Sequence, residues 1–129
     1  MSDSTIEAEI KAKGLTAPRV TSADIKANIA SEHYFTASDG FVGHQTMWPV
    51  KECTACPQAL SLLTFCVLVL KNGFTVTGES ACASPENFDA ELGRKIAREN
   101  AIAKVWPLMG YALKEQLYQA TVQVQPTQL

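Results

Sequence analysis

The residues of this chain that could bind a ligand gather in its second half. A small polar segment runs from Ser80 to Ser84, and Ser84-Pro85 is a common start for a helix. The free backbone N–H groups and the dipole at a helix N-terminus can hold a phosphate group. The segment is not a P-loop, because it lacks the Gly-Lys-Ser/Thr ending. The sequence therefore predicts an anion site at the start of this helix.

Positively charged and aromatic residues follow in the same region. Arg94 and Arg98 lie one helical turn apart and can pair with an anion, while Trp48 and other aromatic side chains can stack on a nucleobase. A structural alternative stays open, in which Ser84 only caps the helix, the arginines face solvent and Trp106 belongs to the core. The predicted ligand-binding residues are Ser80, Ser84, Arg94, Arg98, Lys104, Trp106 and Tyr111.

The cysteines raise the question of a zinc site. Cys53 and Cys56 have a spacing at which two thiolates can bind Zn²⁺, and a tetrahedral site would need His44 or Cys66 as well. Cys66 lies inside an apolar run, which is typical of a buried thiol. The order of His44 and the cysteine pair is similar to that in zinc deaminases, but Thr46 stands where those enzymes have Glu. A lone Cys-x-x-Cys pair is a weak signal, so we predict no metal site and no cofactor.

A complete catalytic constellation is missing from the sequence. A nucleophilic hydrolase would need a base near Ser80 or Cys82. The two histidines, His33 and His44, lie in no recognisable motif. We therefore predict that the chain is not an enzyme.

Composition narrows the class of protein further. The 129 residues are 47% hydrophobic and 19% charged, which predicts one domain over residues 1–119 with a loose tail at 120–129. A net charge of −2 argues against general nucleic-acid binding. The start of the chain carries no cationic or apolar leader, and the apolar run near Phe65–Leu70 is far shorter than the roughly 20 residues of a membrane helix. We therefore expect a cytoplasmic protein without membrane contact.

A β-hairpin and a long helix must position the candidate residues. The apolar run Leu62–Leu70 predicts a buried strand. Asn72-Gly73 predicts a two-residue turn, because both residue types tolerate a positive φ. Phe74–Thr77 alternates like a half-buried return strand, and Gly78 marks a bulge or a close backbone approach.

The long helix is predicted to begin at Ser84-Pro85 and to bury a stripe of large apolar residues. Gly93 and Ala97 are small and one turn apart, so the hairpin or a partner helix can pack closely there. Trp106-Pro107 predicts an end or a kink, followed by a second helix over about residues 108–119. The predicted buried stripe consists of Phe88, Leu92, Ile96, Ile102 and Val105.

Two helices are predicted ahead of the hairpin. The first spans residues 4–14, with Ser4 and Glu7 as a capping box and Gly14 as its stop, and the second runs from Thr21 to about Ser31.

The segment between these helices and the hairpin is less regular. Tyr34–Thr36 predicts a short edge strand before a turn at Asp39-Gly40, and residues 38–59 are expected to be irregular. The predicted fold class is α+β: two N-terminal helices, an antiparallel β-hairpin that a third strand can extend, and a long C-terminal helix plus a second helix.

Three motifs resemble a known family. They are NGFxVxGES from Asn72, NFD from Asn87 and KxWPLxGY from Lys104, with small residues at 93, 97 and 101 between the last two. Together they resemble a family of small tailed-phage proteins named after its founding phage genes, gene 49 and gene 66, over roughly residues 15–117. The resemblance implies a phage or prophage origin and expression in a bacterial cytoplasm, and it implies no activity.

Small size, phage resemblance, mild acidity and the missing catalytic residues favour a non-enzymatic phage accessory protein. The most concrete hypothesis is an oligomer that sequesters a phosphate-bearing nucleotide signal of host antiviral defence. The alternatives are a protein–protein interaction module that inhibits a host enzyme, or an enzyme that cleaves such a signal. The apolar excess suggests a homo-oligomer with Gly93 and Ala97 as a contact, although intramolecular packing explains the same residues.

Overall fold

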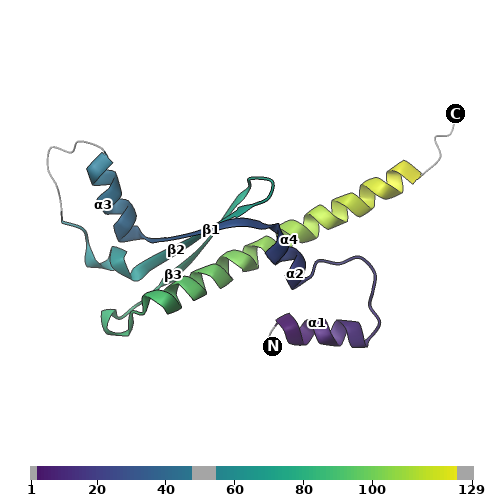
Figure 1. Cartoon of the computed structure of the whole chain (residues 1–129), viewed down its shortest axis with the longest axis horizontal. Helices are drawn as coiled ribbons and strands as arrows, with labels where there is room; N and C mark the ends of the chain where they lie inside the picture. The colour runs from purple at the N-terminus through teal and green to yellow at the C-terminus, as the bar shows by residue number, and fades with distance from the viewer. Residues whose placement is uncertain (1–2, 48–54, 125–129) are drawn as a thin grey trace. The chain divides into compact units, whose positions relative to one another are not determined.

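The computed structural model describes residues 3–47 and 55–124 and confirms the predicted α+β class. The chain forms two compact units, one of residues 29–104 and one that combines residues 1–28 with 105–129. In chain order (Figure 1), the elements are α1 (Asp3–Ala12), α2 (Ser22–Asn28), β1 (Ile29–Thr36), α3 (Ala37–Met47), the 3₁₀ turn η1 (Gln58–Leu62), β2 (Leu63–Leu70), β3 (Thr75–Ala81), the 3₁₀ turn η2 (Pro85–Asn87) and α4 (Ala90–Val124).

The unit of residues 29–104 is built on a three-stranded antiparallel sheet in the order β1-β2-β3. Cys66 of the central strand pairs with Tyr34 on one side and with Gly78 on the other. The predicted hairpin is therefore confirmed, and the predicted edge strand is present and longer than Tyr34–Thr36. Side chains on one face of β2 are fully buried, which matches the alternation of a strand that packs on a helix.

The reversal between β2 and β3 lies at the predicted place but has a different backbone. Only Gly73 has a positive φ, at +89°, and its N–H donates to the carbonyl of Leu70. Asn72 instead accepts a hydrogen bond from the N–H of Phe74 through Oδ1. This pattern fits a type I turn followed by a left-handed glycine, so the expectation of a positive φ at both residues was wrong.

The face of α4 that packs on the sheet carries small residues, which confirms the predicted close packing of Gly93 and Ala97 against the hairpin, but the predicted burial of Leu92 and Ile96 is wrong. Ala97 and Ala101 are completely buried, and a Cβ built on Gly78 of β3 would overlap the carbonyl of Ala97 and the N–H of Ala101. In contrast, Leu92 is 54% exposed and Ile96 is 42% exposed. Glycine and alanine have small side chains, so the backbone of α4 can lie directly on the backbone of β3. The large residues Leu92 and Ile96 therefore lie on the flanks of the helix.

The start and the end of α4 also differ from the sequence prediction. The helix begins at Ala90, where the Asp89 carboxylate accepts the N–H of Leu92 at 3.0 Å, and Ser84 makes no side-chain cap to the 3₁₀ turn that follows it. It then continues through Pro107 to Val124, so a separate second helix is absent and residues 120–124 are helical. One missing N–H costs less than ending a 35-residue helix whose bonds continue on both sides.

The other unit contains the two predicted N-terminal helices, each somewhat shorter than expected. Gly14, just after α1, has a φ of +68°, as the predicted stop requires. Thr21 and Asp24 form a reciprocal capping box at the start of α2, with N···O distances of 2.9 and 3.1 Å. Glu7 accepts two hydrogen bonds from Arg19, at 2.8 and 3.0 Å.

The stretch predicted as irregular contains ordered structure. A second capping box, with the same bonds between Thr36 and Asp39, starts α3 directly after β1, so the predicted turn at Asp39-Gly40 is the first turn of a helix. Trp48 and Cys53 lie outside the described residues. Among the described helices, none has the length and apolarity to cross a membrane.

Candidate functional site

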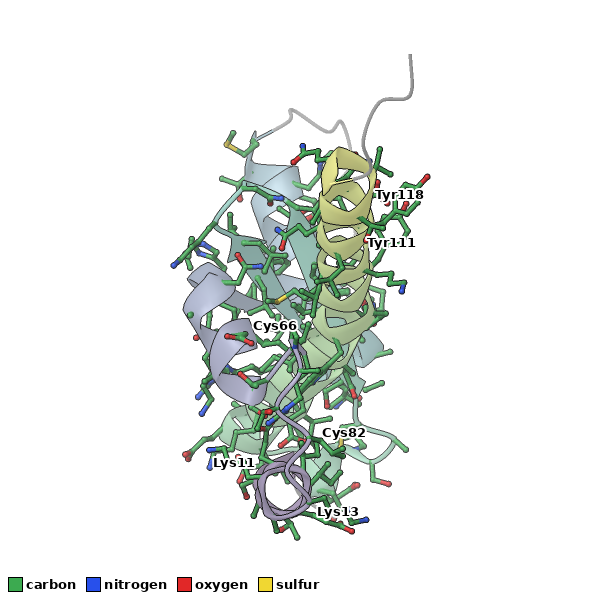
Figure 2. The ribbon with its side chains drawn as sticks, turned by 90° about the vertical axis from the view of Figure 1, so that its right-hand side faces the viewer. Lys11, Lys13, Cys66, Cys82, Tyr111 and Tyr118 are labelled. Carbon is green, nitrogen blue, oxygen red and sulfur yellow. The ribbon has the colours of Figure 1, made fainter. Side chains whose placement is uncertain are left out.

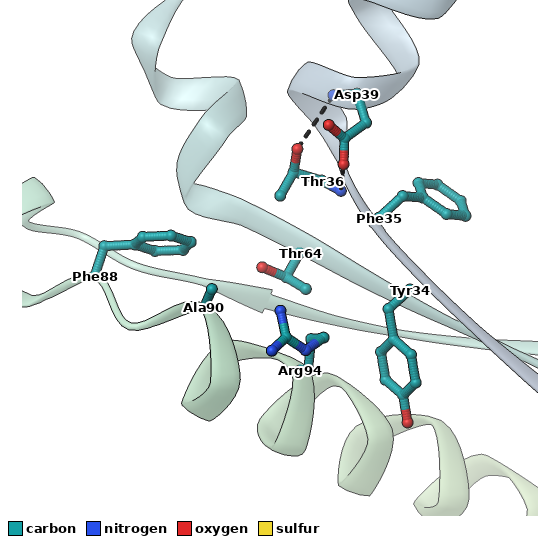
Figure 3. A pocket seen from close by; sticks show the side chains of 8 residues that line it. All are labelled: Tyr34, Phe35, Thr36, Asp39, Thr64, Phe88, Ala90 and Arg94. Carbon is teal, nitrogen blue, oxygen red and sulfur yellow. Dashed lines mark hydrogen bonds between the residues drawn. The ribbon is translucent and has the colours of Figure 1, made fainter.

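A hollow of about 100 Å³ lies within the unit of residues 29–104, beside the first turns of α4. Figure 3 shows side chains from β1, β2 and α4 directed into it from different sides. Strand β1 forms one wall and the helix forms another, so the hollow exists because α4 approaches the sheet closely without covering the edge strand. Its lining residues are Tyr34, Phe35, Thr36, Asp39, Thr64, Phe88, Ala90 and Arg94.

Arg94 brings the positive charge to this hollow. Its guanidinium extends from α4 toward Thr64 (Figure 3), and no carboxylate in residues 3–47 or 55–124 pairs with it. An arginine offers five N–H donors in a planar arrangement that matches phosphate or carboxylate oxygens. Arg94 is therefore available to an anionic ligand.

Arg98, one turn further along α4, is already engaged. Its Nε donates to Glu32 of β1, and the hydroxyl of Tyr34 donates to the same carboxylate oxygen at 2.9 Å. Partial burial opposes ionisation of Glu32, but the hydrogen bonds from Arg98 and Tyr34 outweigh it and lower the pKa of Glu32 below its usual value. Burial and the bond to Glu32 raise the pKa of Tyr34, so the phenol keeps its proton. This network fixes the helix to the edge strand.

Asp39 and Thr64 add polar atoms to the hollow. Oδ2 of Asp39 accepts the N–H of Thr36 at 2.9 Å, and the carboxylate lies at the upper wall of the hollow in Figure 3. Thr64 is only 3% exposed, yet its hydroxyl lines the hollow and forms no hydrogen bond with any other described residue. A Cβ placed on Gly93 would lie 3.2 Å from this hydroxyl, so the glycine leaves room for it.

A second hollow, of about 130 Å³, lies on the other side of α4 and contains Ser80. Nearby, the Cys82 thiol donates to the carbonyl of Ser84 at 3.1 Å. Phe88 lines both hollows and so separates them. The second hollow is more apolar, and its lining residues are Leu62, Ser80, Ala81, Cys82, Asn87, Phe88, Asp89, Leu92, Gly93 and Ile96.

The remaining predicted residues do not join either hollow. Nζ of Lys104 lies 3.9 Å from Glu79, and both side chains are about half exposed. Trp106 is half-buried and Tyr111 is 73% exposed, and both belong to the other unit. Of the seven predicted residues, Arg94 and Ser80 line a hollow. Ser84 precedes η2 and not the α-helix, whose first N–H groups face Asp89.

The part of α4 beyond residue 104 exposes several large apolar side chains. Tyr118 is 59% exposed and Val122 is 46% exposed, and Figure 2 shows Tyr111 and Tyr118 projecting from the same side of the helix. Together with Leu108, these positions follow the three-and-four spacing of a coiled-coil face, interrupted by Glu115.

Sequence reasoning missed most of the residues that line the first hollow. Phe88 was assigned to the buried stripe, and Asp39 was assigned to a turn. One signal was available, because Thr36-x-x-Asp39 repeats the pattern of Thr21-x-x-Asp24, which was recognised as a helix start. No local pattern connects Thr64 to Arg94.

The cysteines lie apart from the hollow that contains Arg94. Cys56, Cys66 and Cys82 are free thiols, and burial raises the pKa of the Cys66 thiol. In the part of the chain that the structure describes, no three His, Cys, Asp or Glu side chains gather as metal ligands. Cys53, one half of the candidate pair, lies outside that part.

Comparison with known proteins gives one result. Searches of curated proteins and of solved structures found no match. Residues 20–117 match the model of the phage protein family described as N4 Gp49/phage Sf6 gene 66. The match includes every residue that lines the two hollows. This chain belongs to that phage protein family, as the motifs at Asn72, Asn87 and Lys104 indicated.

Proposed function

We propose that this chain is a phage accessory protein that counters host defence by binding and sequestering a phosphate-bearing nucleotide signal in the host cytoplasm. The observation that carries the proposal is Arg94, a guanidinium without a protein partner among the described residues, at the rim of a hollow with aromatic walls. Arginine supplies paired donors to a phosphate, and Phe88 and Tyr34 offer apolar surface to the rest of a nucleotide.

The engagement of Arg98 supports this assignment of roles. Glu32 and Tyr34 hold Arg98 in place, whereas Arg94 forms no salt bridge with any described carboxylate, so a phosphate that approaches α4 meets Arg94 as the unpaired cation. Lys104 lies near Glu79 and is similarly compensated. Arg94 is therefore the residue on which we expect ligand affinity to depend most.

The size of the hollow supports an oligomer. Pockets that enclose a drug-sized ligand measure about 300–1,000 Å³, whereas this hollow measures about 100 Å³ and so accommodates only part of a nucleotide. We propose that a second copy of the chain covers the rest. The exposed face at Leu108, Tyr111, Tyr118 and Val122 has the spacing with which two such helices associate.

Capture without cleavage is the preferred chemistry. The polar side chains at the hollow are suited to hydrogen bonding, and the high pKa of Tyr34 keeps its phenol neutral. His33 bonds with Ser31, its neighbour on β1, and is not a lining residue of the hollow. Mass spectrometry of a nucleotide after incubation with the protein should therefore recover it intact.

Calorimetry with a panel of cyclic nucleotides and ADP-ribose derivatives tests the proposal. At least one should bind with a Kd below about 10 μM, roughly −7 kcal/mol. Arg94→Ala should weaken that binding at least tenfold. Lys95→Ala is the matched control, because Lys95 is the next residue on α4, is exposed and pairs with Glu91 on the helix surface. A panel without any binder below 10 μM, or equal losses in both variants, would reject the proposal.

A protein–protein interaction module that inhibits a host enzyme is the second candidate. Leu92 and Ile96 favour it, because both are about half exposed beside the more apolar second hollow. Affinity purification from a bacterial lysate distinguishes the two functions. A stoichiometric host protein that is lost with Ile96→Lys supports the module, while an oligomer with small-molecule absorbance near 260 nm supports nucleotide capture.

A further inference from the structure

We infer that the hollow beside Arg94 recognises the ribose of its ligand, with Asp39 and Thr64 bound to the sugar hydroxyls while Arg94 holds the adjoining phosphate. The inference rests on the proposed function and specifies which part of the nucleotide enters the hollow. It follows from the different hydrogen-bonding groups and charges of the three side chains, each of which requires a different group on the ligand.

The first demand comes from Asp39. An ionised carboxylate only accepts hydrogen bonds, and Oδ2 already accepts the N–H of Thr36. In residues 3–47 and 55–124, no donor is bound to Oδ1. A ligand group near this oxygen must therefore donate a hydrogen bond, and a phosphate would be repelled there. The hydroxyl groups of a sugar meet this demand, because an O–H···O⁻ bond is charge-assisted.

The second demand comes from Thr64. The Thr64 side chain is nearly buried, but its hydroxyl opens onto the hollow and has no hydrogen-bond partner among the described residues. The Thr64 hydroxyl faces the hollow, so a ligand hydroxyl can satisfy it. Because a threonine hydroxyl both donates and accepts, it suits a neighbouring sugar hydroxyl that already donates to Asp39.

The third demand is the charge of Arg94, which selects an anion at the α4 side of the hollow. A ribose phosphate carries hydroxyl donors and an anionic group on one small frame. The volume of about 100 Å³ is below the roughly 300–1,000 Å³ of pockets that enclose a drug-sized ligand, so the hollow encloses only a fragment of a nucleotide. A base attached to the sugar would then extend past Phe88, which stands at the boundary of the hollow.

Titrations of the full-length protein with ribose 5-phosphate and 2-deoxyribose 5-phosphate, followed by NMR, test this inference. Ribose 5-phosphate should bind at least tenfold more tightly, because the 2-deoxy sugar lacks one hydroxyl. Asp39→Asn should reduce the difference to threefold or less, and Thr64→Val should also reduce it. Arg94→Ala should weaken the binding of both sugar phosphates.

Asp24→Asn provides the matched control. Asp24 forms the same capping box with Thr21 that Asp39 forms with Thr36, so any general effect of the substitution on a helix start appears in both variants. Discrimination between the two sugar phosphates should persist in Asp24→Asn.

Equal binding of the two sugar phosphates, absence of binding by either at 10 mM, or equal loss in Asp39→Asn and Asp24→Asn would each overturn the ribose assignment. The proposed function is tested separately by calorimetry with the nucleotide panel, whose result does not depend on which part of the ligand enters the hollow. The failure of one is therefore distinguishable from the failure of the other.

Discussion

Gly78 of β3 lies against the backbone of Ala101 in α4, at a distance that leaves no space for a side chain. A Cβ added to Gly78 would lie 2.8 Å from the Cα of Ala101 and would also overlap its N–H and the carbonyl of Ala97. The obstacle consists of backbone atoms, so a rotamer change cannot relieve it. This contact sets the distance between the helix and the sheet in the unit of residues 29–104.

Gly78→Ala should therefore lower the free energy of unfolding by about 3 kcal/mol, the upper end of the usual cost of overpacking. Chemical denaturation measures the change. Gly110→Ala is the control, because a Cβ at Gly110 in α4 meets nothing within 4 Å. That variant should be stabilised by about 0.5–1 kcal/mol, since alanine favours a helix. A similar stability of the two variants would contradict the observed packing.

Substitutions at two neighbouring positions on α4 should destabilise the protein to different extents. Ala97→Leu places bulk on the buried face beside Gly78 and should destabilise the protein by about 1–3 kcal/mol. Ile96→Ala removes a side chain that is 42% exposed and should cost less than about 1 kcal/mol. Thermal unfolding of both variants measures which face of α4 is buried. A larger loss of stability for Ile96→Ala than for Ala97→Leu would show that the large apolar residues form the buried face.

The start of α4 can be tested through its cap. Asp89→Ala removes the carboxylate that accepts the N–H of Leu92 and should lower the free energy of unfolding by about 1 kcal/mol. Ser84→Ala should have little effect, because the Ser84 side chain makes no capping bond. If Ser84→Ala proved to be the costlier change in denaturant unfolding, the helix would begin where the sequence suggested.

The ion pair between Glu32 and Arg98 should make stability depend on pH. Folding lowers the pKa of Glu32 from its ordinary value of 4.5, so its contribution is complete above that value and is lost as the pH falls through the folded pKa. Glu32→Gln should cost about 1 kcal/mol at pH 7, since both side chains are about one-third exposed. The cost should be smaller at pH 3 than at pH 7, because protonation of Glu32 removes the ion pair as the pH falls.

Denaturant unfolding at both pH values measures this change. Glu91→Gln serves as the control, because Glu91 pairs with Lys95 on the exposed surface and should matter little at either pH. A cost for Glu32→Gln that is the same at pH 3 and pH 7 would show that the charge of Glu32 is not what matters.

Local signals in the sequence predicted local structure well. The hairpin at Asn72-Gly73 and the helix stop at Gly14 depend on backbone preferences of single residues, and both lie where the sequence placed them. The family motifs were likewise sufficient to identify the family. The start of α4 was misplaced because Ser84-Pro85 and Asp89 are both acceptable helix starts, and the first forms only a 3₁₀ turn.

The buried face of α4 required information from another element. Helical periodicity allows two faces of α4 to be buried. One face carries large residues such as Leu92 and Ile96, and the other carries the small residues Gly93, Ala97 and Ala101. The usual preference for burying large apolar residues is right for Val105 but wrong for Leu92 and Ile96, whereas the predicted close contact at Gly93 and Ala97 is confirmed. Gly78, on a different element, resolves the choice, because a glycine in a strand and small residues on a helix together indicate direct backbone contact.

The candidate site could be predicted only in part. Arg94 was identified because a cation on a helix is visible in the sequence, whereas its surroundings come from strands far away along the chain. Thr64 and Tyr34 became neighbours of Arg94 only through the pairing of β1 with β2. Arg98 and Arg94 are equivalent in the sequence, and only the position of Glu32 separates the engaged arginine from the available one.

The direct contact between Gly78 and α4 has a consequence for how this protein can change over time. Because main-chain atoms hold the helix in place, the residues on its two flanks, Arg94 on one side and Ile96 on the other, contribute little to that attachment. Mutations at these flanks can therefore accumulate while the framework persists.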